Sequence, residues 1–179
     1  AAIAISRSVS TANLIAGNIS FKQSALSATD IGVQAAMNKF NSHASGVLSV
    51  DANTRNDSAA DCYRATSFNN DDATPVDMRM DPRGIPNILL DSSKFDDSYG
   101  NCKSKHPNTK ETIRYVIDRQ CSVAGLADES TCTVYSRSAV GGSEGSSQTG
   151  SENIPLYRVS VRVDGAHNTT SYSQVIIHP

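Results

Sequence analysis

The first 43 residues of the chain carry one amphipathic pattern that no proline interrupts. The larger apolar side chains recur at spacings of three, four or seven residues, which places them on one face of an α-helix. These residues are Ile15, Ile19, Leu26, Val33, Met37 and Phe40. A stop signal follows at Ser42 to Gly46, where the glycine is a candidate C-terminal cap. The pattern predicts one helix over residues 1–43 that buries Leu26, Val33, Met37 and Phe40 against the rest of the fold.

Such a helix is too long for a compact body of this size. At 1.5 Å per residue it measures about 65 Å, whereas a compact domain of this chain length has a diameter of roughly 40 Å. A third or more of the helix is therefore expected to project. The projecting end should be the N-terminal one, because Ala1 to Ile5 is apolar without alternation, like the end of a longer hydrophobic segment.

A second pattern places a small residue at every fourth position along the same helix. The row consists of Ser8, Ala12, Ala16, Ser20, Ser24, Ala28, Gly32 and Ala36. Such a row forms a shallow ridge that another helix can approach closely, so it is the candidate assembly surface. Gly17 and Gly32 each cost a helix about 1 kcal/mol relative to alanine, which a packed or locally unwound helix tolerates better than a free one. The alternative is that serine and alanine are simply abundant here.

The remainder of the chain divides into two parts. Residues 47–110 are rich in turn-forming Asp, Asn, Ser and Pro, and the short apolar run Ile88 to Leu90 could be a strand or a buried turn. Residues 111–179 alternate as strands do, at 113–118, 133–135, 157–164 and 173–177, with a turn at 164–168. The Gly/Ser-rich segment 140–153 is expected to be a mobile surface loop, since strands flank it. The whole chain, 1–179, is therefore expected to be one α+β domain, a long helix packed on an antiparallel sheet.

The chain has four cysteines, Cys62, Cys102, Cys121 and Cys132, and an even number favours two disulfides in an oxidising compartment. Free buried thiols are the alternative. We expect Cys62 to pair with Cys102, which would pin the irregular segment, and Cys121 with Cys132, which would join two strand ends. Four cysteines allow three pairings, and the other two stay open.

The composition and the absence of known motifs exclude several classes of function. With a net charge of −2 there is no basic excess for nucleic acid, and no run approaches the roughly 20 apolar residues of a membrane span. No motif of a metalloprotease, nucleotide-binding loop or serine hydrolase is present, so we predict no catalytic residues and no cofactor. Cys102 and His106 could form half of a zinc site, but no second pair stands at ligand spacing.

Two further sets of residues each allow a functional interpretation and an ordinary structural one. Calcium could bind an acidic cluster, but acidic turns are usually just solvated. The two clusters are Asp71, Asp72 and Asp77, and Asp91, Asp96 and Asp97. A binding patch on the sheet could comprise Tyr157, Arg158, Arg162 and Tyr172, although such residues more often form the solvent face of a sheet.

Two stretches of the chain carry a family resemblance. One is Ala16-Gly17-Asn18 in the helix, with Ala25 to Ala28 and Ala35-Ala36; the other is the terminal hairpin, Tyr157 to Val163 with Asn168 to Thr170 and Val175 to Ile177. Both resemble the PilX-type minor pilins of type IV pili, and Ile113 to Cys121 is similar as well. The chain looks like such a pilin without the first half of its hydrophobic helix. It departs from the family at Ala28-Thr29-Asp30, where members often have Ala-x-Glu.

The resemblance implies the type IV pilin fold and a structural, non-enzymatic role. The expected protein is a minor pilin that helps to start pilus assembly, in a tip complex with other minor pilins and a large adhesin. Its N-terminal helix would contact minor and major pilins, and the inner membrane before assembly. The expected location is the inner membrane with a periplasmic domain, and then the extracellular pilus.

Three alternatives from other classes stay open. A minor pseudopilin of a type II secretion system shares this architecture. A carbohydrate-binding adhesive module would place recognition in residues 47–110. A secreted hydrolase is the weakest alternative, because no nucleophile–base pair can be identified from the sequence.

Overall fold

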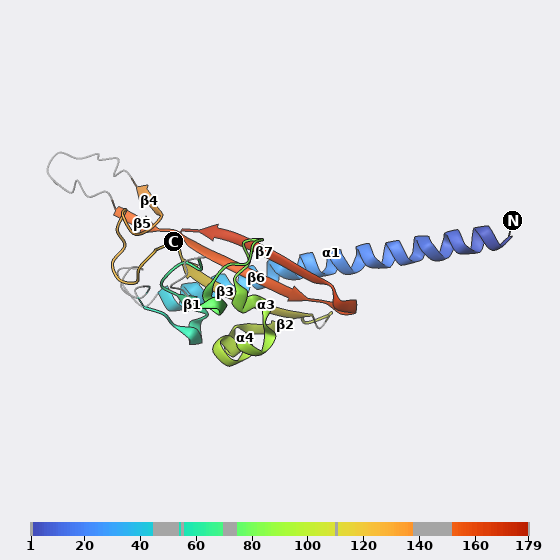
Figure 1. Cartoon of the computed structure of the whole chain (residues 1–179), viewed down its shortest axis with the longest axis horizontal. Coiled ribbons are helices and arrows are strands. Elements are labelled where there is room, and N and C mark those ends of the chain that lie inside the picture. The colour runs from blue at the N-terminus through green and yellow to red at the C-terminus, as the bar shows by residue number, and fades with distance from the viewer. Residues whose placement is uncertain are drawn as a thin grey trace.

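The fold is an α+β arrangement in which one long helix packs on a mixed sheet (Figure 1). The computed structural model describes residues 2–44, 54, 56–69, 75–109, 111–137 and 152–178. Within these ranges the helix, the sheet and the intervening segments form one body, from which the N-terminal part of the helix projects.

Helix α1 (Ala2–Ala44) is a single helix of 43 residues, as the sequence predicts. It continues through Gly17, where an added Cβ would meet nothing within 4 Å. Figure 1 shows its N-terminal half running away from the body, while its C-terminal half lies along the sheet. The expected projection of this helix is therefore confirmed.

The main sheet has five strands, and the expectation of a purely antiparallel sheet is wrong in one respect. The strands are β1 (Tyr63–Arg64), β2 (Lys103–Lys105), β3 (Thr112–Arg119), β6 (Tyr157–Asp164) and β7 (Thr170–Ile177). Their order is β1-β3-β6-β7, and β2 also pairs with β3. Strand β1 pairs parallel to β3, whereas the other pairs are antiparallel. The parallel strand comes from the middle of the chain, where the Cys62–Cys102 disulfide holds the adjoining residues.

A second, two-stranded sheet consists of β4 (Val134–Arg137) and β5 (Glu152–Pro155). The two strands are joined by residues 138–151, so the expected loop at 140–153 lies almost wholly outside the described residues. Its predicted position between two strands is confirmed, since β4 and β5 pair with each other.

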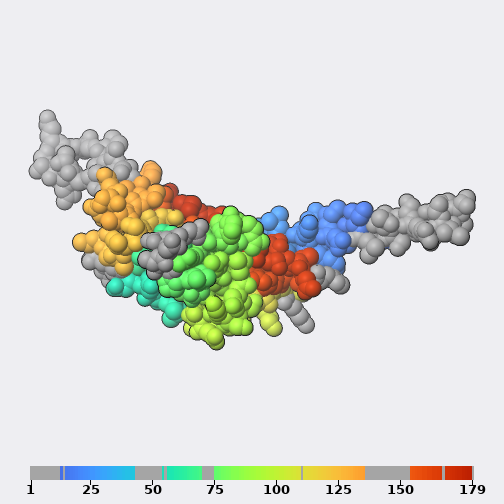
Figure 2. Space-filling model, in the orientation of Figure 1, coloured from blue at the N-terminus to red at the C-terminus, as the bar shows by residue number. Residues whose placement is uncertain are grey.

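The middle of the chain has more regular structure than its composition suggests. Its short helices are the 3-10 turns η1 (Ala59–Asp61), η2 (Val76–Met78) and η3 (Gly100–Cys102), and the α-helices α3 (Asn87–Leu90) and α4 (Ser92–Tyr99). The run expected to be a strand or buried turn is α3, with Ile88 and Leu89 buried. Asp91 caps α4 by accepting from the backbone N–H of Ser93 and Lys94. Figure 2 shows the residues of α3 and α4 in green across the middle of the face toward the viewer.

The central strands β3 and β6 are consequently covered on both faces, and α1 contributes to the hydrophobic core on one of them. The residues that α1 buries are Ala25, Ala28, Thr29, Gly32, Ala36 and Phe40. Of the four residues predicted to be buried, Phe40 is buried, but Leu26 is 61% exposed, and Val33 and Met37 are only half-buried. Small residues form the interface between α1 and the sheet because the helix lies very close to the sheet. A Cβ on Gly32 would lie 2.5 Å from Cγ1 of Val161 and 2.8 Å from Cγ2 of Ile113.

Candidate functional site

The projecting part of α1 exposes apolar side chains along one flank. Ile15 and Ile19 are 55% and 50% exposed, and Ala16 and Ser20 are exposed beside them. Between Asn13 and Thr29 the only charged residue is Lys22. An exposed helix with so little charge is unusual in water, where polar residues normally cover the solvent face. This helix is the candidate assembly surface.

The row of small residues does not form one continuous assembly surface. Ala28, Gly32 and Ala36 are buried on the chain's own sheet, and half-buried Ser24 donates to Glu111 Oε1 at 2.8 Å. Ala16 and Ser20 remain exposed on the projecting part. The side chains of Ser8 and Ala12 lie outside the described residues. The C-terminal half of the row therefore serves packing within the domain, and only its N-terminal half is left for a partner.

Both disulfides have the expected pairing. Cys62 bonds Cys102 and Cys121 bonds Cys132, with Cα–Cα distances of 5.5 and 3.9 Å. The zinc half-site suggested by Cys102 and His106 is therefore wrong, because the Cys102 sulfur is bonded to Cys62. Across the described ranges, no group of three or more His, Cys, Asp and Glu residues converges as a metal site would.

Two members of the second acidic cluster have local structural partners. Asp91 caps α4, and Asp96 accepts from Lys103 Nζ at 2.6 Å, which lowers the pKa of the Asp96 carboxyl. Asp71 and Asp72 lie outside the described residues.

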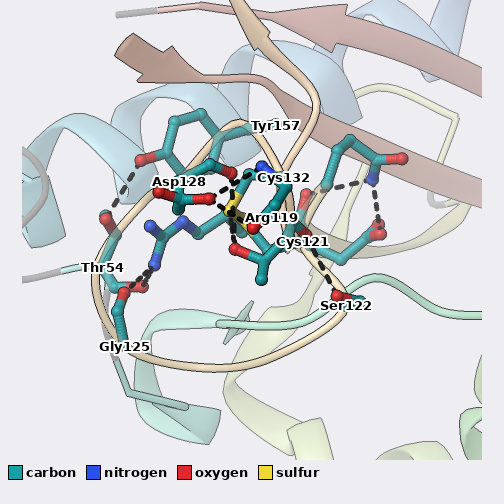
Figure 3. Close-up of a disulfide and its surroundings, with 12 residues drawn as sticks. Thr54, Arg119, Cys121, Ser122, Gly125, Asp128, Cys132 and Tyr157 are labelled. Carbon is teal, nitrogen blue, oxygen red and sulfur yellow. Dashed lines mark hydrogen bonds between the residues drawn. A yellow bond between two sulfur atoms is a disulfide. The ribbon is translucent and has the colours of Figure 1, made fainter. Parts of the chain in front are cut away.

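The Cys121–Cys132 loop lies at the end of the molecule far from the N-terminus and rests on a buried arginine (Figures 1 and 3). Arg119 is fully buried, and its Nη1 donates to the carbonyls of Thr54 at 3.3 Å and Gly125 at 2.6 Å. The Thr54 hydroxyl also hydrogen-bonds the Tyr157 hydroxyl at 3.0 Å. The guanidinium thus ties the disulfide loop to a distant segment of the chain.

The far side of this loop is stabilised locally and presents apolar residues. Asp128 accepts from the Ser130 hydroxyl and from its N–H, and these hydrogen bonds lower the pKa of the Asp128 carboxyl. The backbone N–H of Cys132 donates to the Asp128 carbonyl at 2.8 Å. Val123 and Leu126 are exposed on the loop.

The proposed binding patch on the sheet does not exist as a surface, and the plain interpretation of a solvent face is also wrong. Tyr157 is fully buried on the helix side, with its ring centroid 4.6 Å from that of Phe40. Arg158 donates to Asp118 at 3.0 and 2.6 Å and to the Phe68 carbonyl at 3.1 Å. Arg162 donates to the carbonyls at the end of α3, at 2.6 and 2.9 Å. Only Tyr172 is near the surface, half-buried, with Arg83 5.9 Å over its ring.

The sheet arginines therefore anchor the middle region onto the sheet. Asp118 has no exposed surface, and burial raises the pKa of its carboxyl against the opposing effect of Arg158. Sequence reasoning missed this pair and the buried Arg119. A sequence signal existed for Arg119, which is in phase with the apolar face of β3. The Asp118–Arg158 pair depends on the β3–β6 register, in which the two residues face each other, and that register is set by the tertiary structure.

Comparisons of the chain with protein-family models, with curated proteins and with solved structures gave no match. No helix in the described part of the chain combines the length and hydropathy that a bilayer crossing requires.

Proposed function

We propose that this chain is a structural minor pilin that helps to initiate type IV pilus assembly and performs no catalysis. It would act in a tip complex with other minor pilins and a large adhesin. The observation that carries the proposal is the projecting half of α1, with half-exposed Ile15 and Ile19 and a single nearby charge. The resemblance of the helix and terminal hairpin to PilX-type minor pilins supports the same function.

The physical argument concerns what can stabilise such a helix. An isolated helical stretch of this kind is marginal in water, because most helical stability comes from packing an apolar face. Lipid would cover the apolar residues before assembly, and neighbouring pilin helices would cover them afterwards. The two disulfides fit an oxidising compartment. We therefore place the full-length protein at the bacterial inner membrane with a periplasmic domain, and then in the extracellular pilus.

The test replaces one exposed apolar residue on the projecting helix. The native bacterium first has the gene for this protein deleted from its chromosome. A plasmid copy that carries Ile15→Lys should then restore few or no surface pili, counted by electron microscopy. The matched control is Val76→Lys in the middle region, where the parent residue is 65% exposed. This control should restore piliation, and both purified domains should keep the parental melting temperature.

Other outcomes separate the competing functions. Normal piliation by Ile15→Lys would show that the exposed apolar face of the projecting helix is not needed for pilus assembly. Normal piliation with a defect in protein export would favour a pseudopilin of a type II secretion system. A reproducible hydrolytic activity of the purified domain would contradict a purely structural role.

A further inference from the structure

Strand β7 forms an edge of the sheet and lacks the charges, prolines and bulges that often protect an edge, although the turn at residues 81–85 contacts its Tyr172 and Gln174 side chains. All eight of its residues pair in register with β6, and no described strand pairs with its other side. The strand, Thr-Ser-Tyr-Ser-Gln-Val-Ile-Ile, has no charged residue, no proline and no bulge. Proteins normally blunt an edge with short strands, lysines, prolines or bulges, because a row of free N–H and C=O groups attracts other strands.

The opposite side of the sheet follows the usual rule. There, β1 and β2 have only two and three residues, and β2 places Lys103 and Lys105 on either side of Ser104. The two edges of the sheet therefore differ. The edge formed by β1 and β2 is short and charged, whereas the edge formed by β7 is long and uncharged.

An apolar flank of α1 lies beside this edge. Ser24 donates to Glu111, the residue before β3, so the helix flank that carries Ser24 faces β3. Leu26 is two residues further on, about 200° around the helix, and therefore lies on the β7 side. Val33 and Met37 share that flank, because they follow Leu26 at helical spacing. Helix α1 contacts β7 and runs along the direction of β6 and β7 (Figure 1).

These placements explain why, of the apolar face predicted from the sequence, Leu26 is exposed and Val33 and Met37 are only half-buried. The small residues of α1 face the sheet, and the larger ones overhang its open edge. An additional strand beside β7 would hydrogen-bond the free edge, and its helix-facing side chains would cover Leu26, Val33 and Met37. On β7 itself the helix-facing residues are Ser171, Ser173, Val175 and Ile177, which pair with the buried Val163, Val161, Val159 and Tyr157 of β6.

We propose that the β7 edge and the Leu26 flank together bind an extended segment of another polypeptide as an added β-strand. The backbone groups of the edge require an extended chain, since alternate residues of a strand present hydrogen-bonding groups outward. The lack of charge on β7 offers no ion-pair partner and so favours an uncharged segment, and the flank favours apolar side chains at alternate positions.

The occupant is a strand from a different protein, not a second copy, and this choice rests on the proposed function. Two copies related by a two-fold axis would pair β7 with β7 and set their α1 helices antiparallel. Subunits that pack their helices side by side in one filament need them parallel.

The test uses a synthetic peptide of about eight alternating threonine and valine residues, with a lysine at each end for solubility. Hydrogen exchange of the purified chain should show added protection confined to β7 when the peptide is present. Leu26→Arg should weaken the binding by about tenfold or more. The matched control is Leu126→Arg on the disulfide loop, because Leu126 is 65% exposed and Leu26 is 61% exposed. The control should bind as the parent does.

Three results would overturn the proposal. The peptide could leave β7 unprotected, or Leu126→Arg could weaken binding as much as Leu26→Arg does. The third is a concentration-dependent dimer that protects β7 without peptide, which would make a second copy the occupant. The measurement needs no pilus, so its failure differs from failure of the proposed function, which the Ile15→Lys variant decides in cells.

Discussion

Gly32 lies where α1 comes closest to the sheet, and Gly17 lies on the part of the helix that projects. The two glycines have the same helix propensity but opposite surroundings. Val161 and Ile113, which a Cβ on Gly32 would meet, are buried and cannot move aside easily. A Cβ on Gly17 would meet nothing within 4 Å.

Alanine at these two positions should therefore have opposite effects. Gly32→Ala should lower the free energy of unfolding by about 1–3 kcal/mol, because overpacking outweighs the gain in helix propensity. Gly17→Ala should leave it unchanged or raise it by up to about 1 kcal/mol. Urea unfolding of the two variants measures both effects. Equal stabilities would show that the helix does not lie as close to the sheet as the structure places it.

The Asp118–Arg158 pair gives a second prediction at the residue scale. Arg158→Ala would leave the Asp118 carboxylate buried without its cation, which typically costs about 3–5 kcal/mol. The control is Arg83→Ala, because the Arg83 side chain is 64% exposed and Asp81 would keep its hydrogen bonds from the backbone N–H of residues 83 and 85. That control should have little measurable effect on thermal unfolding. A small effect of Arg158→Ala would mean that the middle region is held to the sheet by other contacts.

At the scale of elements, the two disulfides hold segments that the sheet alone does not. Cys62–Cys102 joins the residue before β1 to the residue before β2, and Cys121–Cys132 closes the loop after β3. Chain-entropy estimates give about 4 kcal/mol for the longer connection and about 3 kcal/mol for the shorter one.

Removal of each disulfide should therefore destabilise the domain in that order. Cys62→Ala/Cys102→Ala should lose more free energy of unfolding than Cys121→Ala/Cys132→Ala, measured by urea unfolding of the two double variants. We also expect the first variant to lose hydrogen-exchange protection at β1 and the second only in residues 122–131. If the variant without Cys121–Cys132 were the less stable of the two, the shorter disulfide would contribute more than its chain entropy. The hydrogen bond from Arg119 to the Gly125 carbonyl would then depend on that disulfide.

At the scale of the whole molecule, the row of small residues passes through two different environments along one helix. Ala28 is buried on the sheet, whereas Ala16 is exposed on the projecting part. The same substitution at these two sites should therefore separate folding from assembly.

Ala16→Phe should keep the melting temperature of the purified domain and reduce surface piliation by the full-length protein, because bulk blocks close approach of a neighbouring helix. Ala28→Phe should unfold or strongly destabilise the domain itself, because the core has no room for the ring. Differential scanning calorimetry and counts of surface pili measure the two effects. Normal piliation by Ala16→Phe, in cells whose other minor pilins cannot substitute, would show that the row of small residues has no role in assembly.

The sequence by itself determined the features that depend on local patterns. It predicted the single helix and its projection, because helix length follows directly from the uninterrupted period and the rise per residue. It also predicted β3, β6 and β7, because alternation and turn residues are local signals. The disulfide pairing it favoured is the one found, although two others were open.

Only the tertiary structure decided which face of α1 is buried, and that β1 joins the sheet in parallel. Periodicity shows that Leu26, Val33 and Met37 share a flank, but it carries no information on how close the helix comes to the sheet. At that short distance Ala28, Gly32 and Ala36 fit and Leu26 does not, so the small residues face the core. Strand order and the anchoring role of Arg158 depend on contacts between segments far apart in the sequence, such as Phe68 and β6, which no local pattern records.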